Sequence, residues 1–374
     1  MFGVGLDPND ANRRTLNRAA FTSRADTDAF SIDSQAQVEL TTGPLAHTLL
    51  FGVDYQHYDF DDTRGFGDAP SLDLYDPVYG APVTKPPSFL DTDSAREQIG
   101  LYLQEQLKLY DRWVIALSGR QDFVSSDTKD RLAGTDSEQD DSEFSGRAGL
   151  VYLSDVGLTP YFSYSESFLP VLGTDAFGEA FKPETGRQYE VGLKYQPPGW
   201  NSLVTLAAFD ILRQNVLSPD PFNQVQTDEI RSRGVELGGV ASLDGGLDII
   251  VAYTYQDVEV TESNTGDEGN RPVATPKHLA SLWADYILQG GLLAGLGFGA
   301  GVRYQGSSFG DAANTLESDD FTLADAALHY EWHGVRFAVH AQNLFDNDHV
   351  AACFGSDCFY GVARTVIGSV RYRW

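Results

Sequence analysis

Residues 364–374 alternate between apolar and polar positions in the manner of an extended strand. One face would carry valine, glycine, valine, tyrosine and tryptophan, and the other mainly hydroxyl and arginine side chains. A tilted strand of about 9–11 residues can cross a bilayer, and this alternation, closed by interfacial aromatic residues, is typical of transmembrane β-barrels. We therefore predict a final barrel strand here, with Val370, Tyr372 and Trp374 as its membrane-insertion signature.

Segments of the same kind recur along the whole chain, as in residues 188–195. A charge that faces hydrocarbon costs a few kcal/mol near the membrane midplane, so we expect Glu190, Lys194 and Arg336 to face the lumen. The predicted strands, about 16 in number, cover residues 13–24, 29–41, 46–59, 97–109, 112–125, 142–154, 158–168, 186–196, 202–216, 227–243, 246–258, 278–289, 294–305, 321–331, 334–344 and 363–374.

The connections between these segments alternate in length. Bacterial barrels place short turns on the periplasmic side and long loops outside. Counting back from a periplasmic C-terminus, every short turn falls inside and every long loop falls outside. A soluble β-sandwich has no reason to keep this order. The short turns lie at 42–44, 110–112, 155–157, 197–199, 244–246, 289–291 and 333–334, and the long loops at 60–96, 126–141, 169–185, 217–226, 259–277, 306–320 and 345–362.

The composition is compatible with a membrane protein that spans with strands. The chain has 374 residues, of which 12% are aromatic, and no apolar run reaches the 18 residues of a candidate transmembrane helix. We predict an all-β fold, a transmembrane antiparallel β-barrel in the Gram-negative outer membrane, as one unit over residues 1–374. Residues 1–14 lack the basic and apolar segments of a signal peptide. We therefore expect a fragment, or a sequence begun at an internal methionine.

The net charge of −28 excludes nucleic acid as a partner, because binding to phosphates requires basic residues. Acidic residues cluster at 59–62, 136–143, 257–268 and 317–320. Charge runs of this kind normally form solvated segments, here loops. The alternative is a barrel rim on which divalent cations bridge to lipopolysaccharide, and the sequence does not decide between the two.

The two cysteines, Cys353 and Cys358, lie five positions apart. In an oxidising compartment, such a pair is expected to form a small loop disulfide. A zinc site would need two further ligands, and only His349 is near in sequence. We predict the disulfide.

Other chemistry-bearing patterns lack the context that they require. His329 and His333 have the spacing of metal ligands on a helix, but they fall at a strand end and a turn, where their side chains diverge. The glycines of 295–301 lack the strand-to-helix context of a phosphate-binding loop. No nucleophile, base and acid form a recognisable catalytic motif. We expect no enzyme activity and no resident metal or cofactor.

Five ordered motifs resemble the barrel of TonB-dependent ferric-siderophore receptors, most closely the ferrichrome (hydroxamate) branch. The resemblance extends over nearly the whole chain, and five motifs at matching spacing are more specific than any one of them. The motifs are SYSESFLPVLGTDAFGEAFKPETGRQYEVGLKYQPPG (163–199), EIRSRGVELGG (229–239), TPKHLASLWADY (275–286), GVRYQGSSFGDAAN (301–314) and AQNLFDNDHVAACF (341–354).

The resemblance implies an outer-membrane receptor that imports ferric siderophores with energy delivered by the TonB complex, so that iron is cargo rather than cofactor. It further implies insertion by the barrel assembly machinery and a 22-stranded barrel with a plugged lumen. The chain departs from this pattern because it lacks a plug domain and about six strands. The capture of the chelate could reside here, but the TonB-contacting segment would not. A passive outer-membrane pore and a non-functional truncated receptor are the alternatives.

The resemblance also places ligand contacts on aromatic residues at the extracellular mouth. The matching position in the loop before the last strand is Phe354, and Phe66 with Tyr75 occupy a comparable loop at 60–96. Flat aromatic surfaces suit a bulky, nearly neutral chelate. The alternative is that these residues belong to an aromatic girdle or fill a loop. Phe359 and Tyr360 are expected to pack at the loop base.

Overall fold

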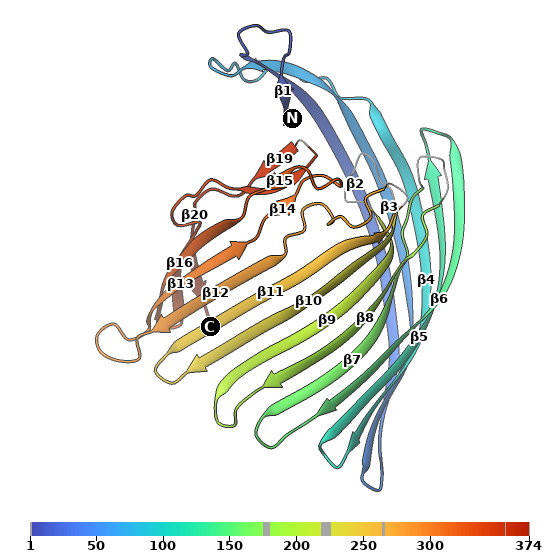
Figure 1. Cartoon of the computed structure of the whole chain (residues 1–374), viewed down its shortest axis with the longest axis vertical. Coiled ribbons are helices and arrows are strands. Elements are labelled where there is room, and N and C mark those ends of the chain that lie inside the picture. Colours follow the sequence, from blue (N-terminus) through green and yellow to red (C-terminus); the bar gives the residue numbers. More distant parts are fainter. Residues whose placement is uncertain (1, 175–179, 218–225, 264–265, 356, 374) are drawn as a thin grey trace.

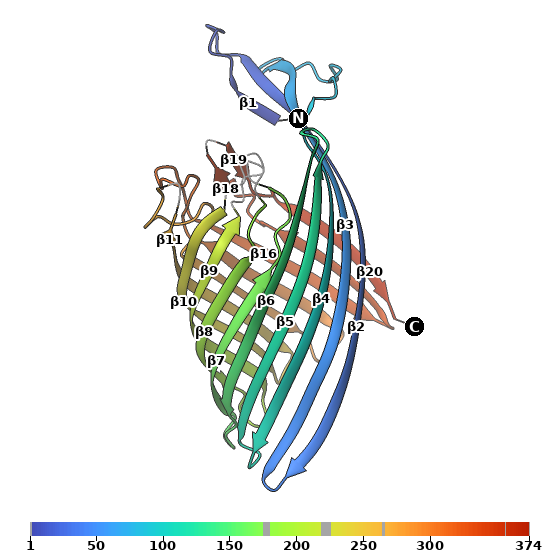
Figure 2. The same ribbon diagram turned by 90° about the vertical axis from the view of Figure 1, so that its right-hand side faces the viewer.

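The computed structural model describes residues 2–174, 180–217, 226–263, 266–355 and 357–373. Within them, sixteen strands form one antiparallel sheet in which each strand lies beside its neighbour along the chain. The sheet curves strongly around an open interior (Figures 1 and 2). Two small hairpins, β14–β15 and β18–β19, lie outside this sheet. The described part of the chain contains no helix long and apolar enough to cross a membrane.

The sheet runs from β1 to β13 and then through β16 and β17 to β20. The strand bounds are β1 Phe2–Leu6, β2 Thr15–Thr42, β3 Leu45–Asp73, β4 Ser88–Leu109, β5 Trp113–Asp130, β6 Thr135–Tyr152, β7 Leu158–Leu169, β8 Glu184–Tyr195, β9 Asn201–Leu217, β10 Gln226–Leu243, β11 Leu247–Glu262, β12 His278–Ile287, β13 Leu296–Gln305, β14 Ser308–Phe309, β15 Glu317–Ser318, β16 Phe321–Trp332, β17 Val335–Gln342, β18 Val350–Phe354, β19 Asp357–Tyr360 and β20 Thr365–Tyr372.

Alternation along the strands gives the sheet one apolar and one polar face. Val53 and Leu101 are partners in the β3–β4 register, and both are exposed on the apolar face. One position along, Asp54 and Gly100 are partners on the polar face. Successive side chains of a strand point to opposite faces, so the apolar residues form a surface for lipid and the polar residues line the concave side.

The polar face contains a connected layer of charged and hydroxyl groups across β2–β5. The guanidinium of Arg120 donates to Asp54 at 3.0 Å and to Asp122 at 2.7 Å, and both carboxylates are buried. Beside them, the Tyr102 hydroxyl donates to Asp33 at 2.7 Å. These bonds compensate the charges that the alternation turns away from lipid.

Charges predicted to face the lumen lie on the polar face. Glu190 accepts a hydrogen bond from the Tyr161 hydroxyl at 2.5 Å, and the Lys194 ammonium lies 5.2 Å from the centre of the same ring. Arg336 is the register partner of Glu331 on one side and Arg371 on the other. Their grouping on one face confirms the expectation.

The predicted alternation of short turns and long loops holds at most connections but fails between β5 and β6, and several predicted boundaries are wrong. The predicted break between 13–24 and 29–41 does not exist, because β2 continues through it. The predicted loop 60–96 is much shorter, since β3 continues to Asp73 and β4 begins at Ser88. The loop predicted at 126–141 is a tight turn between β5 and β6.

These errors have a common physical cause. The acidic clusters at 59–62 and 136–143 lie within β3 and β6 rather than in loops. Both strands continue well past the length that crosses a bilayer, about 9–11 residues. Beyond the membrane both faces of a strand can meet water, so the apolar alternation disappears while the backbone pairing continues.

The last strand occupies 365–372, within the predicted 363–374. Val370 and Tyr372 lie on the apolar face, opposite Phe337 and Val335 of β17, and both are exposed. Trp374 lies outside the described residues. The role of these residues in membrane insertion stays a prediction.

Candidate ligand-binding site

A cavity of about 580 Å³ lies on the polar face of the C-terminal strands, beneath the segment 345–362. The wall is formed by strands β11, β12, β13, β16 and β17. The segment 345–362, which precedes β20, covers the cavity on the side away from this wall. The residues that give it polar and aromatic character are Ser281, Arg303, Phe321, Asn343, His349 and Tyr360.

Asn343 holds the covering segment against the wall. Its side chain is only 2% exposed, and its amide donates to the Asn347 carbonyl at 2.9 Å and the Val362 carbonyl at 3.2 Å. Its backbone N–H donates to Asp325 at 2.9 Å, and Asp325 also binds the Arg303 guanidinium at 2.6 and 3.0 Å. Both ends of the segment are therefore fixed to β16 through one buried amide.

His349 belongs to the covering segment and lies between Phe321 of the wall and Gly361. Its ring centre is 4.4 Å from that of Phe321, and the Gly361 N–H donates to its backbone carbonyl at 2.9 Å. A Cβ at position 361 would lie 1.8 Å from the imidazole Nε2. Only glycine at position 361 leaves room for the imidazole in this place.

The disulfide predicted between Cys353 and Cys358 is confirmed, and it closes the β18–β19 hairpin. Phe354 and Phe359 stand edge to face with ring centres 6.1 Å apart. Phe359 is 59% exposed and Tyr360 is 79% exposed, so the expectation that they pack at the loop base is wrong. The hairpin instead presents aromatic surface to the solvent.

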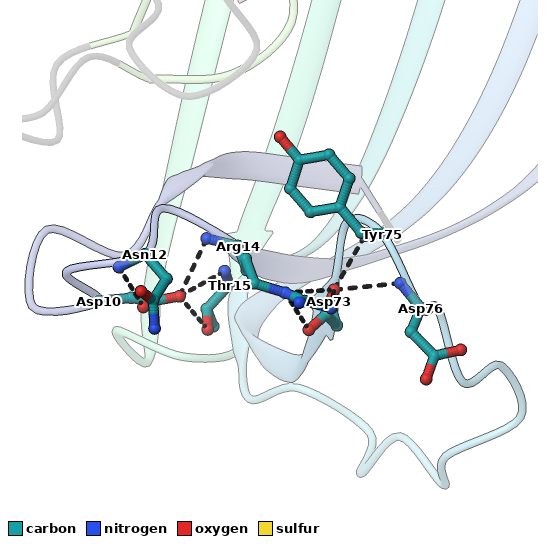
Figure 3. Close-up of polar contacts among 7 residues, drawn as sticks. All are labelled: Asp10, Asn12, Arg14, Thr15, Asp73, Tyr75 and Asp76. Atoms are coloured by element: carbon teal, nitrogen blue, oxygen red, sulfur yellow. Dashed lines mark hydrogen bonds and ion pairs between the residues drawn. The ribbon is translucent and has the colours of Figure 1, made fainter.

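A separate aromatic position lies at the far tip of β2 and β3 (Figure 3). The Arg14 guanidinium binds Asp73 at 3.0 Å and lies 5.5 Å from the centre of the Tyr75 ring. The backbone N–H groups of Tyr75 and Asp76 donate to Asp73 at 2.8 and 3.1 Å. Arg14 therefore lowers the pKa of Asp73, with the backbone donors adding to the effect.

The neighbouring turn is organised by a second carboxylate. Asp10 accepts hydrogen bonds from the Thr15 hydroxyl and from the backbone N–H groups of Asn12, Arg14 and Thr15, at 2.8 to 3.0 Å (Figure 3). These bonds, the Thr15 hydroxyl first among them, lower the pKa of Asp10 to about 2. Tyr75 thus lies beside the charged groups of Arg14 and Asp73, at the same tip as Asp10.

The three predicted contact residues fall into two groups, one at the end of β3 and one in the β18–β19 hairpin. Phe66 lies in β3 opposite Phe21 of β2, and its N–H donates to the Pro87 carbonyl at 3.1 Å. Tyr75 follows the end of the same strand, whereas Phe354 belongs to the disulfide hairpin. Both groups lie toward the end of the sheet that carries the long loops (Figures 1 and 2).

Much of the cavity is formed by residues that the sequence analysis does not assign to a site. They are Arg303, Asn343, His349 and Tyr360. For Arg303, Asn343 and His349, the signal available in the sequence is their position within the motifs 301–314 and 341–354. Among the described residues, no three histidine, cysteine or acidic side chains come together to hold a metal ion. The cavity can therefore offer hydrogen bonds, one paired arginine and aromatic surface to a ligand.

Comparison with known proteins identifies the family. Residues 3–344 match the family described as TonB dependent receptor-like, beta-barrel. The chain is 40% identical over 364 residues to the ferrichrome outer membrane transporter/phage receptor of Escherichia coli K12, which covers 92% of this chain and 48% of the relative. It is 36% identical over 375 residues to the ferrioxamine B receptor of Salmonella typhimurium, with 96% and 52% covered.

Solved structures agree on the fold. The siderophore receptor PiuA from Acinetobacter baumannii superposes with a TM-score of 0.84 at 20% identity, over 98% of this chain and 58% of that structure. The chain spans about half the length of the curated relatives that it matches. The chain belongs to the TonB-dependent receptor β-barrel family of the Gram-negative outer membrane.

Proposed function

We propose that this chain is the barrel portion of a TonB-dependent receptor that takes up ferric hydroxamate siderophores. The supporting observation is the cavity beneath segment 345–362, which combines aromatic rings with neutral hydrogen-bonding groups. Such a lining suits a bulky chelate that carries little net charge. Relatives named for ferrichrome and ferrioxamine support the hydroxamate class.

Within this proposal, Phe354, Phe66 and Tyr75 contact the ligand at the mouth. Phe354 is the strongest candidate because its hairpin belongs to the segment that covers the cavity, and its ring is 39% exposed. Tyr360 joins the set, since it lines the cavity and is largely exposed. Iron is cargo bound to the siderophore, and the chain acts as a receptor rather than an enzyme.

The partners follow from the same proposal. The ferric siderophore binds the barrel interior, and the TonB complex acts on the receptor through parts outside this chain. The barrel assembly machinery inserts the strands, and lipopolysaccharide surrounds the outer rim.

A chimeric receptor tests the proposal. The segment of the E. coli ferrichrome transporter that aligns with this chain is replaced by residues 1–374, in a strain that lacks its own hydroxamate receptors. We expect uptake of radioactive iron from a ferric hydroxamate only when the strain has TonB. The variant Phe354→Ala should reduce binding about ten-fold, because stacking and burial of a ring contribute about 1–3 kcal/mol. The control is Tyr195→Ala. Tyr195 is the last residue of β8, next to the short turn that leads to β9 and therefore away from the Phe354 hairpin.

Two outcomes would contradict the proposal. A chimera that reaches the outer membrane but takes up no hydroxamate would exclude this substrate class. Uptake that continues without TonB, together with steady ion conductance in planar bilayers, would instead support a passive pore.

A further inference from the structure

A second cavity, of about 470 Å³, lies on the polar face of the N-terminal strands. Strands β3 to β6 form its wall, and the segment before β8 covers it through Phe181, which is 3% exposed. Asp62 pairs in register with Thr92, and Ser94 pairs with Thr128, so all four side chains share the face that lines the cavity. We call it the Asp62 cavity.

Asp62 is a buried carboxylate with one unused oxygen. Its side chain is 3% exposed, and its Oδ2 forms an ion pair with the Arg64 guanidinium at 2.7 Å. Its Oδ1 is buried and has no hydrogen-bond partner among the residues that the structure describes. A buried carboxylate oxygen without a donor costs free energy. We therefore infer that this oxygen accepts a hydrogen bond from a donor group of a ligand that enters the cavity.

Two hydroxyl groups of the same cavity lining add further acceptors. Ser94 and Thr128 lie 3.1 Å apart, hydroxyl to hydroxyl, and are 3% and 8% exposed. A hydroxyl has two acceptor lone pairs, and the bond between these two uses only one of them. Phe60, stacked on Tyr58 with ring centres 6.0 Å apart, contributes an aromatic wall.

The geometry discriminates between kinds of cation. A calcium ion requires six to eight oxygen ligands, and no three acidic or histidine side chains converge within the described residues. A guanidinium would seek both oxygens of the carboxylate, but Arg64 already occupies one. An ammonium group needs only single acceptors for its three donors and is attracted by aromatic faces.

We propose that the Asp62 cavity binds the primary ammonium group of a ligand. This inference rests on the proposed function and names a preference within it: ferric hydroxamates with a free amine should bind more tightly than the same chelates with that amine acylated. Asp130 and Asp136 also border the cavity. Among the described charged residues of the lining, only Arg64 opposes these three carboxylates, which favours a cationic group.

The test compares two ligands that differ only at the amine. The full chain, folded in detergent micelles, is titrated with a linear ferric trihydroxamate that has a free terminal amine, and with its N-acetylated form. We expect about a ten-fold preference for the free amine, as a charge-assisted hydrogen bond provides. Asp62→Asn should abolish the preference, and Ser94→Ala should reduce it. Asp61→Asn is the control, because Asp61 binds Arg131 at 2.6 Å and does not line the cavity.

Each result has a separate meaning. Equal affinity of wild-type chain for the two chelates overturns the ammonium site while leaving hydroxamate capture intact, and water then fills the cavity. A preference that survives in both Asp62→Asn and Ser94→Ala also overturns it. If neither chelate binds to folded chain, the proposed function fails and the ammonium preference fails with it. Circular dichroism of each variant shows whether the sheet has formed.

Discussion

At the scale of single residues, the glycines of β13 provide space on the polar face. A Cβ at Gly299 would lie 2.3 Å from the Trp283 ring and 2.9 Å from the Asp285 carboxylate. At Gly297, a Cβ would lie 2.0 Å from the imidazole of His329, which is buried and binds Asp285 at 3.0 Å. The glycine run that resembles a phosphate loop thus accommodates two large rings of the neighbouring strands.

We predict that Gly299→Ala destabilises the sheet by about 1–3 kcal/mol, because the new methyl group displaces Trp283 from a filled position. Denaturant titration in micelles, followed by tryptophan fluorescence, measures the loss. Gly368→Ala is the matched control, since a Cβ there meets nothing within 4 Å. Equal stability of the two variants would show that the Trp283 ring can move without cost.

Asp10 gives a prediction about pH at the same scale. Its pKa is lowered to about 2 from 3.8, so its contribution to the turn is complete above pH 3.8 and is lost as the pH falls toward 2. The amide resonances of Arg14 and Thr15, observed by NMR in micelles, should shift with a midpoint near pH 2. Asp10→Asn should remove this transition, whereas Asp28→Asn, on an exposed strand position, should not. A midpoint near 4 in the unsubstituted chain would contradict the hydrogen bonds to Asp10.

At the scale of elements, the β18–β19 hairpin depends on its cross-link more than the main sheet does. The hairpin has few neighbours, and Cys353 and Cys358 close a loop with a sequence separation of 5. In the chain-entropy account, a loop this short contributes about 2 kcal/mol. Because β18 and β19 pair outside the main sheet, we expect the hairpin to open separately from it, so that this contribution confines the ring of Phe354 rather than stabilising the sheet.

We predict that the double variant Cys353→Ser/Cys358→Ser unfolds at the same denaturant concentration as the wild type but is cut faster by protease within 350–360. It should also bind a ferric hydroxamate more weakly, because ordering the hairpin then opposes binding. Mass spectrometry of the fragments locates the cut. A large loss of sheet stability would mean that the hairpin holds the wall together.

The strands and the sites differed in how far the sequence could predict them. Strands within the membrane-spanning part are predictable because lipid on one side enforces alternation, as in residues 188–195. The tip of β6 was not, because residues 136–141 are polar at every position although they pair with β5. Its motif was sufficient to assign Phe354 to the segment before the last strand. Asn343 could not be assigned its role, since it bonds to Val362 and Asp325 across turns that alternation does not encode.

At the scale of the whole molecule, the sheet has two edges. β1 covers β2 only at Leu16–Ala19, and within the described residues no pairing joins β20 to β1 or β2. The edge of β20 therefore presents unpaired N–H and C=O groups on one side. Lipid cannot satisfy such groups, which cost several kcal/mol each in hydrocarbon. A membrane-inserted form therefore needs further strands along both edges, or closure of the sheet on itself.

Hydrogen exchange distinguishes these two forms. In an antiparallel edge strand, alternate N–H groups bond to the one neighbour and the others point away. For the chain alone in micelles, we predict slow exchange at alternate residues of β20 and fast exchange between them, while the interior strands β11 and β12 are protected throughout. In the chimeric receptor, where additional strands are present, every amide of β20 should exchange slowly. Uniform protection of β20 in the chain alone would show a sheet closed on itself, and the passive pore would then become the favoured form of this chain.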